Sequence, residues 1–179
     1  MKFNFLQTSF VIFIIANSSN VVQYLSQIVL GRYLSVADYG IYNSVQSLSL
    51  TVVSFIAIIP FVVSKFMIEF QDDIIYRNSI IRKIFGYIVI INSLFCIILY
   101  LLSYQIGVFL KIYELSPIYI FIVSIYFTVI YTYFDSILRG LRLYISSTLQ
   151  GTILTVLRFS FIIILVVFMH KSYNGALIA

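Results

Sequence analysis

Apolar residues form long, almost uncharged runs along this chain, and short polar segments separate them. The runs cover approximately residues 9–31, 37–64, 84–104, 117–138 and 144–169, and residues 175–179 begin another apolar stretch. Each long run reaches the about 20 residues that an α-helix needs to cross about 30 Å of hydrocarbon. The pattern predicts an all-α, multi-spanning membrane helix bundle with five complete transmembrane helices and the start of a sixth.

A polar corner, LGRYLSVADYGIYNSVQS (residues 30–47), separates the first two runs. Ser35 followed three residues later by Asp38 is the pattern of a helix N-cap and its reciprocal acid, so a helix should begin directly after Ser35. Asp38 also suits the positive end of that helix dipole. Gly31 and Gly40 allow two helices to end and begin close together. We predict a tight corner between two membrane helices.

Several amide side chains interrupt the first two runs. Asn20, Gln23 and Gln27 fall at helical spacing on one face of the first run. Facing lipid would be costly for them, so we expect them to face protein or a wet cavity. In the second run, Pro60 should kink the helix because it removes a backbone donor. Asn43 in that run fits helix-to-helix hydrogen bonding and a substrate cavity equally well.

The remaining segments are predicted as connections. Residues 65–83 are the most charged segment and are predicted to form an aqueous loop with some amphipathic helix. Residues 111–117 and 170–174 are predicted turns. In the corner 135–142, Asp135 and Arg139 are four residues apart and could pair on one helix face.

Composition supports a membrane location. Hydrophobic residues make up 62% of the 179 residues and charged residues 9%, and the mean hydropathy is +1.09. A soluble domain is nearer half apolar and a quarter charged, so the solvent of this chain is lipid. The single cysteine, Cys96, excludes an intramolecular disulfide, and the single histidine, His170, argues against a metal site.

The distribution of basic residues predicts the orientation. With a cytoplasmic N-terminus, the inner side holds Lys2, Lys65, Arg77, Arg82, Lys83, Arg139 and Arg142, and the outer side holds Arg32, Lys111 and Lys171. Seven against three follows the positive-inside rule, so we expect the N-terminus inside and the corner at residues 30–47 outside.

The informative charged residue is Arg158, near the middle of the fifth run. A lone arginine there costs at least about 2.5–3.5 kcal/mol, so it should face a cavity or a partner. Its planar fork suits the oxygens of a pyrophosphate head group. A structural ion pair and snorkelling to the membrane surface are the alternatives. Acids are scattered and no catalytic constellation, phosphate-binding loop or cofactor motif is present, so we expect no enzymatic activity and no cofactor.

Two stretches carry a resemblance to a known family. LGRYLSVADYGIYNSV resembles the segment after the first helix of the polysaccharide-unit flippases, through Arg32, Leu34, Ser35, Asp38, Tyr39 and Gly40. Val36 and Ala37 depart from the family's frequent proline and acid. LRGLRLYISSTLQGTILTVLRF resembles the family's corner between the fourth and fifth helices, where a basic residue is common at the position of Arg158.

The resemblance implies a member of the multidrug/oligosaccharidyl-lipid/polysaccharide exporter superfamily. Such a protein moves a polyprenyl-pyrophosphate-linked oligosaccharide across a bacterial cell (inner) membrane by alternating access, for O-antigen, lipopolysaccharide or capsule synthesis. The implied partners are membrane lipid and that substrate, with a coupling ion (H⁺ or Na⁺) left open and no nucleic acid. Arg158 is the first candidate for the anionic head group, and Arg32, Asn20, Gln23, Gln27 and Asn43 are further cavity candidates.

Family members have 12 to 14 helices in two lobes, so we expect residues 1–179 to be an N-terminal fragment, an incomplete first lobe that is inactive by itself. Three alternatives remain. The cargo could be a drug or another lipid-linked precursor, the chain could be a small structural or assembly membrane protein, or it could be a membrane-embedded polymerase or ligase of the same pathway.

Overall fold

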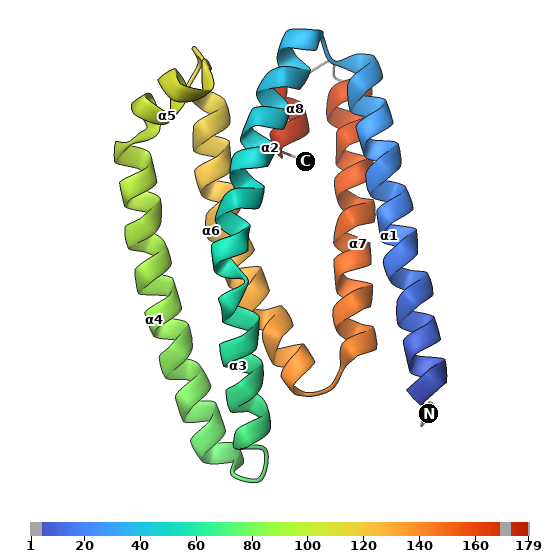
Figure 1. The fold of residues 1–179 in the computed structure, drawn as a ribbon, viewed down its shortest axis with the longest axis vertical. Helices are drawn as coiled ribbons and strands as arrows, with labels where there is room; N and C mark the ends of the chain where they lie inside the picture. Colours follow the sequence, from blue (N-terminus) through green and yellow to red (C-terminus); the bar gives the residue numbers. More distant parts are fainter. Residues whose placement is uncertain (1–4, 169–172, 179) are drawn as a thin grey trace. The chain divides into compact units, whose positions relative to one another are not determined.

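The computed structural model describes residues 5–168 and 173–178, and every regular element in these residues is a helix (Figure 1). Five spans are long and apolar enough to cross a membrane: Leu6–Tyr33, Val36–Glu69, Ile74–Leu101, Ser116–Gly140 and Tyr144–Phe168. The predicted fold class is therefore confirmed, and the chain is a multi-pass membrane protein. Lys2, His170, Lys171 and part of the predicted turn 170–174 lie outside the described residues.

The chain divides into two compact units. The first unit joins Met1–Tyr42 to Leu143–Ala179, and the second is Asn43–Arg142. The first unit therefore combines the beginning of the chain with a segment about a hundred residues later.

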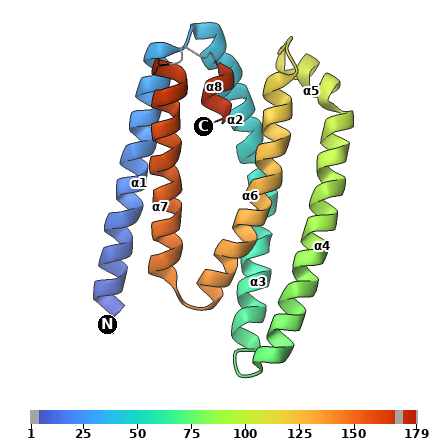
Figure 2. The same cartoon turned by 180° about the vertical axis from the view of Figure 1, so that it is seen from behind.

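Helix α1 (Phe5–Tyr33) packs along α7 (Tyr144–Ile162) in the first unit, as both views show (Figures 1 and 2). The Ser19 and Thr152 hydroxyls lie 2.6 Å apart across this contact, and Ser26 and Ser147 are buried. Small residues allow membrane helices to approach closely, and Leu30 of α1 and Ile162 of α7 belong to one buried apolar cluster in the same unit. A π-helical segment, η1 (Ile163–Phe168), continues α7, and α8 (Tyr173–Ile178) follows.

The corner after α1 has the predicted form. Helix α2 (Val36–Ile56) begins directly after Ser35, whose Oγ accepts a hydrogen bond from the backbone N–H of Asp38 at 3.1 Å. Only Leu34 and Ser35 separate the two helices. The predicted N-cap is therefore confirmed, and it satisfies one of the orphan donors at the start of α2.

The second predicted helix is interrupted, as expected from Pro60. Helix α2 ends at Ile56, and α3 (Ile58–Glu69) begins after Ala57. Pro60 has no N–H to donate to the carbonyl of Ile56, so the regular helical ladder fails at this point. Together α2 and α3 form one span of 34 residues.

Residues 65–83, predicted as an aqueous loop with some amphipathic helix, are mostly helical. Helix α3 continues to Glu69 and α4 (Ile74–Leu101) begins at Ile74, so only residues 70–73 connect them. Asp73 caps α4, because its carboxylate accepts a hydrogen bond from the backbone N–H of Tyr76 at 2.9 Å. The charges here lie on helix ends, and a count of charged residues alone cannot distinguish a charged helix from a loop.

A short helix, α5 (Ser103–Leu110), follows α4 and ends in the predicted turn. Lys111 has a left-handed backbone with φ 56° and ψ 34°. The N–H of Lys111 donates to the Val108 carbonyl at 3.2 Å, and that of Ile112 donates to the Gly107 carbonyl at 2.9 Å. This is the Schellman pattern, which closes the last carbonyls of a helix.

Helix α6 (Ser116–Gly140) forms the centre of the second unit and packs on α3 and α4. A Cβ added at Gly140 would lie 2.4 Å from the Met67 Cβ, so α3 and α6 approach closely there. The Tyr133 hydroxyl donates to the Ile81 carbonyl at 3.0 Å and joins α6 to α4. The predicted pair is present, with Arg139 Nε 2.7 Å from an Asp135 carboxylate oxygen.

Candidate functional site

Arg158 lies in the middle part of the fifth span. It stands 14 residues after Tyr144 and 10 before Phe168, which at 1.5 Å per residue is about 21 Å and about 15 Å along the helix. Its side chain is half-buried, and its Nη2 donates a hydrogen bond to the Tyr42 hydroxyl at 3.2 Å. The Arg158 guanidinium therefore contacts a neighbouring helix inside the span.

Tyr42 is fixed by the apolar core of the first unit. Only 2% of its surface is exposed, and it packs in a cluster with Leu30, Ile162, Val166 and Ala176. Ile162 lies one helical turn after Arg158 on α7, so the same face of α7 carries the cation and the core residue. The packing of Tyr42 determines where its hydroxyl meets Arg158.

A second tyrosine extends these polar contacts to α1. Tyr39 lies one turn before Tyr42 on α2, and the two rings stack with centroids 6.5 Å apart. The Tyr39 hydroxyl donates to the Gln27 Oε1 at 3.2 Å. We call Gln27, Tyr39, Tyr42 and Arg158 the polar cluster. It joins one residue of α1, two of α2 and one of α7, all in the first unit.

The polar cluster lies within the candidate membrane spans, near the corner between α1 and α2. Gln27 is six residues before the end of α1 at Tyr33, and Tyr42 is six residues after the start of α2 at Val36. Both positions are about 9 Å from the corner, compared with about 15 Å for half of the hydrocarbon thickness. Arg158 is the only charged member of the cluster, so the cluster carries a positive charge within the spans.

The cluster offers several donors to an anion. A guanidinium has five N–H donors in a planar fork, the Tyr42 phenol has one O–H, and the Gln27 carboxamide has an NH₂ group. The Tyr39 O–H already donates to Gln27. Hydrogen bonds between such donors and a phosphate oxygen are charge-assisted and stronger than neutral ones. The arrangement can therefore bind an oxyanion at membrane depth.

The other predicted cavity residues lie elsewhere. Asn20 and Gln23 are exposed on α1, on the same face as Gln27 and nearer the middle of the span. Arg32 is exposed in the last turn of α1, where it complements the negative end of the helix dipole. Asn43 is half-buried and belongs to the second unit.

Sequence reasoning did not select Tyr42. A tyrosine one turn after Tyr39 is visible in the sequence, but 15 tyrosines occur in the chain. Its contact with Arg158 joins residues 116 positions apart. One signal in the sequence could have indicated this contact. A tyrosine hydroxyl and an arginine both fall within predicted spans, and each polar group there requires a partner.

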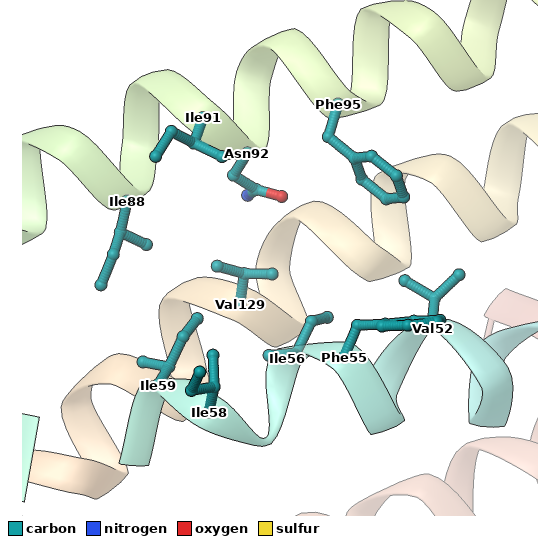
Figure 3. A pocket seen from close by; sticks show the side chains of 10 residues that line it. All are labelled: Val52, Phe55, Ile56, Ile58, Ile59, Ile88, Ile91, Asn92, Phe95 and Val129. Atoms are coloured by element: carbon teal, nitrogen blue, oxygen red, sulfur yellow. The ribbon is translucent and has the colours of Figure 1, made fainter. Parts of the chain in front are cut away.

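A separate apolar groove lies in the second unit, with a volume of about 360 Å³ (Figure 3). Residues of α2 and α3, such as Phe55 and Ile59, face Ile88 and Phe95 of α4 across it. Asn92 is the only polar residue that lines it, and its Nδ2 already donates to the Tyr126 carbonyl at 3.2 Å. The groove can accept a hydrocarbon chain and offers little to a charged head group.

Comparison with known proteins gives no relative: no protein-family model, no curated protein and no solved structure matches this chain.

Proposed function

We propose that this chain takes part in moving a polyprenyl-pyrophosphate-linked oligosaccharide across a membrane, as the N-terminal part of a polysaccharide-unit flippase. The observation that carries the proposal is the contact of Arg158 with Tyr42 inside the fifth span. The residues that resemble the flippase family at the corner after α1 support it, because the same corner supplies Tyr39 and Tyr42 to the polar cluster.

A cation inside the hydrocarbon is retained only with a compensating role. The first unit contains one acidic residue, Asp38, which lies in the first turn of α2. The Tyr42 hydroxyl accepts a hydrogen bond from the Arg158 Nη2 and so orients the guanidinium. A pyrophosphate would add charge-assisted hydrogen bonds to the guanidinium when the substrate is bound.

Uncharged amides suit the sugar part of the same substrate. Asn20 and Gln23 are exposed on α1, and within the described residues neither side chain has a hydrogen-bond partner. They continue the face that carries Gln27 toward the middle of the membrane. A carboxamide can donate to and accept from a sugar hydroxyl, so the head group and the sugars would meet different parts of one polar surface.

The test is binding of a polyprenyl-pyrophosphate to the full chain in detergent, followed by native mass spectrometry. We expect Arg158→Ala to weaken binding about 10- to 100-fold, because hydrogen bonds to charged groups contribute about 1.5–3 kcal/mol. Arg158→Lys should recover only part of the affinity, since an ammonium lacks the planar fork. Tyr42→Phe should have a smaller effect in the same direction.

Lys111→Ala is the control, because it removes one basic residue outside the polar cluster. A polyprenyl monophosphate and a polyprenyl alcohol test the contribution of the pyrophosphate. Equal binding of all three lipids, or full binding by a well-folded Arg158→Ala variant, would rule out the proposed role. Arg158 would then be a structural residue of the α2–α7 contact.

A further inference from the structure

We infer that one end of the second unit binds the headgroups of anionic phospholipids. Lys65, Arg77, Arg82, Lys83, Arg139 and Arg142 lie at the end where α3 meets α4 and where α6 terminates. The other end of the same unit carries Lys111 and Glu114. This inference depends on the membrane location of the chain and is independent of the transported substrate.

Contacts between the three helices bring these basic residues to one level. Gly140 at the end of α6 approaches Met67 of α3, and Ser64 Oγ donates to the Ser136 carbonyl at 3.1 Å. The hydrogen bond from Tyr133 to the Ile81 carbonyl ties the first part of α4 to the same end of α6. Figure 1 shows the α3–α4 turn and the end of α6 at the same end of this unit.

This end has a net charge of +2, because the six basic residues stand against four acids, which are Glu69, Asp72, Asp73 and Asp135. Asp135 pairs with Arg139, and Asp73 caps α4. Within the described residues, neither Arg82 nor Lys83 has an ion pair or hydrogen bond, and both are exposed. The side chains of Arg82 and Lys83 are therefore open to an acceptor from outside the protein.

Arg77 also has an N–H donor without an acceptor. It is half-buried, and its Nε is buried without a hydrogen-bond partner among the described residues. A buried donor without an acceptor is costly. A phosphate oxygen outside the protein could accept from the terminal N–H groups of this partly exposed guanidinium.

Helix lengths place the basic end at the level of the lipid headgroups. Helix α4 has 28 residues, which is about 42 Å, and exceeds about 30 Å of hydrocarbon by about 12 Å. Its first ten residues contain Arg77, Arg82 and Lys83. Placing this excess at the charged end keeps the uncharged remainder of α4 in hydrocarbon, and puts these cations among headgroup phosphates.

The tip of the α3–α4 hairpin has the mixed character of an interfacial segment. Ile75 is 86% exposed and Ile74 is 59% exposed, and the Phe70 and Tyr76 rings meet edge to face at 5.0 Å. Exposed isoleucines are unfavourable in bulk water, whereas aromatic and apolar side chains beside basic residues suit the membrane interface. The occupant is therefore an anionic lipid of the surrounding leaflet, which combines a phosphate with acyl chains.

The test uses the full chain in nanodiscs of phosphatidylcholine with increasing phosphatidylglycerol. Retained phosphatidylglycerol is counted by native mass spectrometry, and the thermal unfolding midpoint is followed in parallel. We expect Lys83→Gln to lower the apparent affinity for phosphatidylglycerol about fivefold, which corresponds to about 1 kcal/mol for each basic residue near an anionic surface. Arg82→Gln with Lys83→Gln should lower it about 25-fold, and added salt should weaken binding by the wild-type chain.

Lys111→Gln is the matched control, because it removes one exposed basic residue from the opposite end of the same unit. It should change the apparent affinity less than twofold. Equal phosphatidylglycerol dependence in Lys83→Gln and the wild-type chain, or an equal loss in Lys111→Gln, would overturn the inference. Soluble glycerophosphate, at the concentration used for phosphatidylglycerol, should not raise the thermal unfolding midpoint. An equal rise would also overturn the inference, because the site would then bind a free phosphate rather than a lipid.

Discussion

Gly140→Ala should destabilise the second unit by separating α3 from α6. A Cβ at this position would lie 2.4 Å from the Met67 Cβ and 2.9 Å from its Cγ, whereas ordinary contacts of a Cβ lie at 3.4–4 Å. The atom met first is a Cβ fixed to the backbone of α3, so a change of rotamer cannot relieve the overlap. Helix α3 must therefore move away from α6 by about 1 Å at this point.

Three terms determine the size of the effect. Overpacking of this kind costs about 1–3 kcal/mol. Moving α3 would also weaken the Ser64 hydrogen bond to the Ser136 carbonyl, worth about 0.5–1.5 kcal/mol. Alanine has a higher helix propensity than glycine by about 1 kcal/mol, which opposes the loss. The sum is a destabilisation of about 0.5–3.5 kcal/mol.

The assay is unfolding of the chain by sodium dodecyl sulfate in mixed micelles, followed by circular dichroism. Gly86→Ala in α4 is the matched control, because a Cβ there would have no atom within 4 Å. It should leave the free energy of unfolding unchanged or raise it by up to about 1 kcal/mol. The Met67→Gly change should partly restore stability to the Gly140→Ala variant, and Met67→Ala should restore little because it keeps the clashing Cβ.

A Gly140→Ala variant as stable as Gly86→Ala would refute the reasoning, because it would mean that α3 and α6 do not approach closely at residue 140. Equal rescue by Met67→Ala and Met67→Gly would refute the steric part of it, since only the second change removes the atom at 2.4 Å.

Three further predictions concern the ends of the helices. Lys111→Gly should raise the free energy of unfolding by about 1 kcal/mol in the same assay, because φ at this residue is 56° and glycine adopts that conformation without strain; a loss of stability would contradict the Schellman assignment. Ser35→Ala should cost about 1 kcal/mol by removing the acceptor for the Asp38 N–H, and Ser35→Asp should retain most of the stability; equal losses would mean that the cap is not needed. In a Cys96→Ser background, a membrane-impermeant thiol reagent on intact cells should label Ser35→Cys and not Asp73→Cys, and the reverse labelling would overturn the orientation derived from the basic residues.

Much of the secondary structure could be predicted from the sequence because its causes are local. The N-cap at Ser35, the break before Pro60 and the pairing of Asp135 with Arg139 each depend on residues within four positions. The loop predicted within residues 65–83 was too long, since charged residues can extend a membrane helix beyond the hydrocarbon as well as form a loop. Asp73 gives the usable signal there, because a capping residue marks the true start of α4.

The candidate site was only partly predictable. Arg158 and Gln27 were selected because polar groups in a membrane span require a partner, and the structure brings both into the polar cluster through Tyr39 and Tyr42. Tyr42 was missed because nothing in its neighbourhood in the sequence distinguishes it from other tyrosines. Its role depends on the packing of its ring against Leu30 and the face of α7.

The sequence by itself determined that this chain lies in a membrane, that it has five spans, and that the fifth carries a charge near its middle. Only the tertiary structure decided that α1 packs on α7, that α6 packs on α3 and α4, and that Tyr42 meets Arg158. The physical reason is the solvent. In lipid, apolar side chains gain little by choosing one helix over another, so hydropathy predicts which segments span the membrane but not which helices pair. Small residues such as Gly140 and a few hydrogen bonds make that choice, and they act only once the helices are side by side.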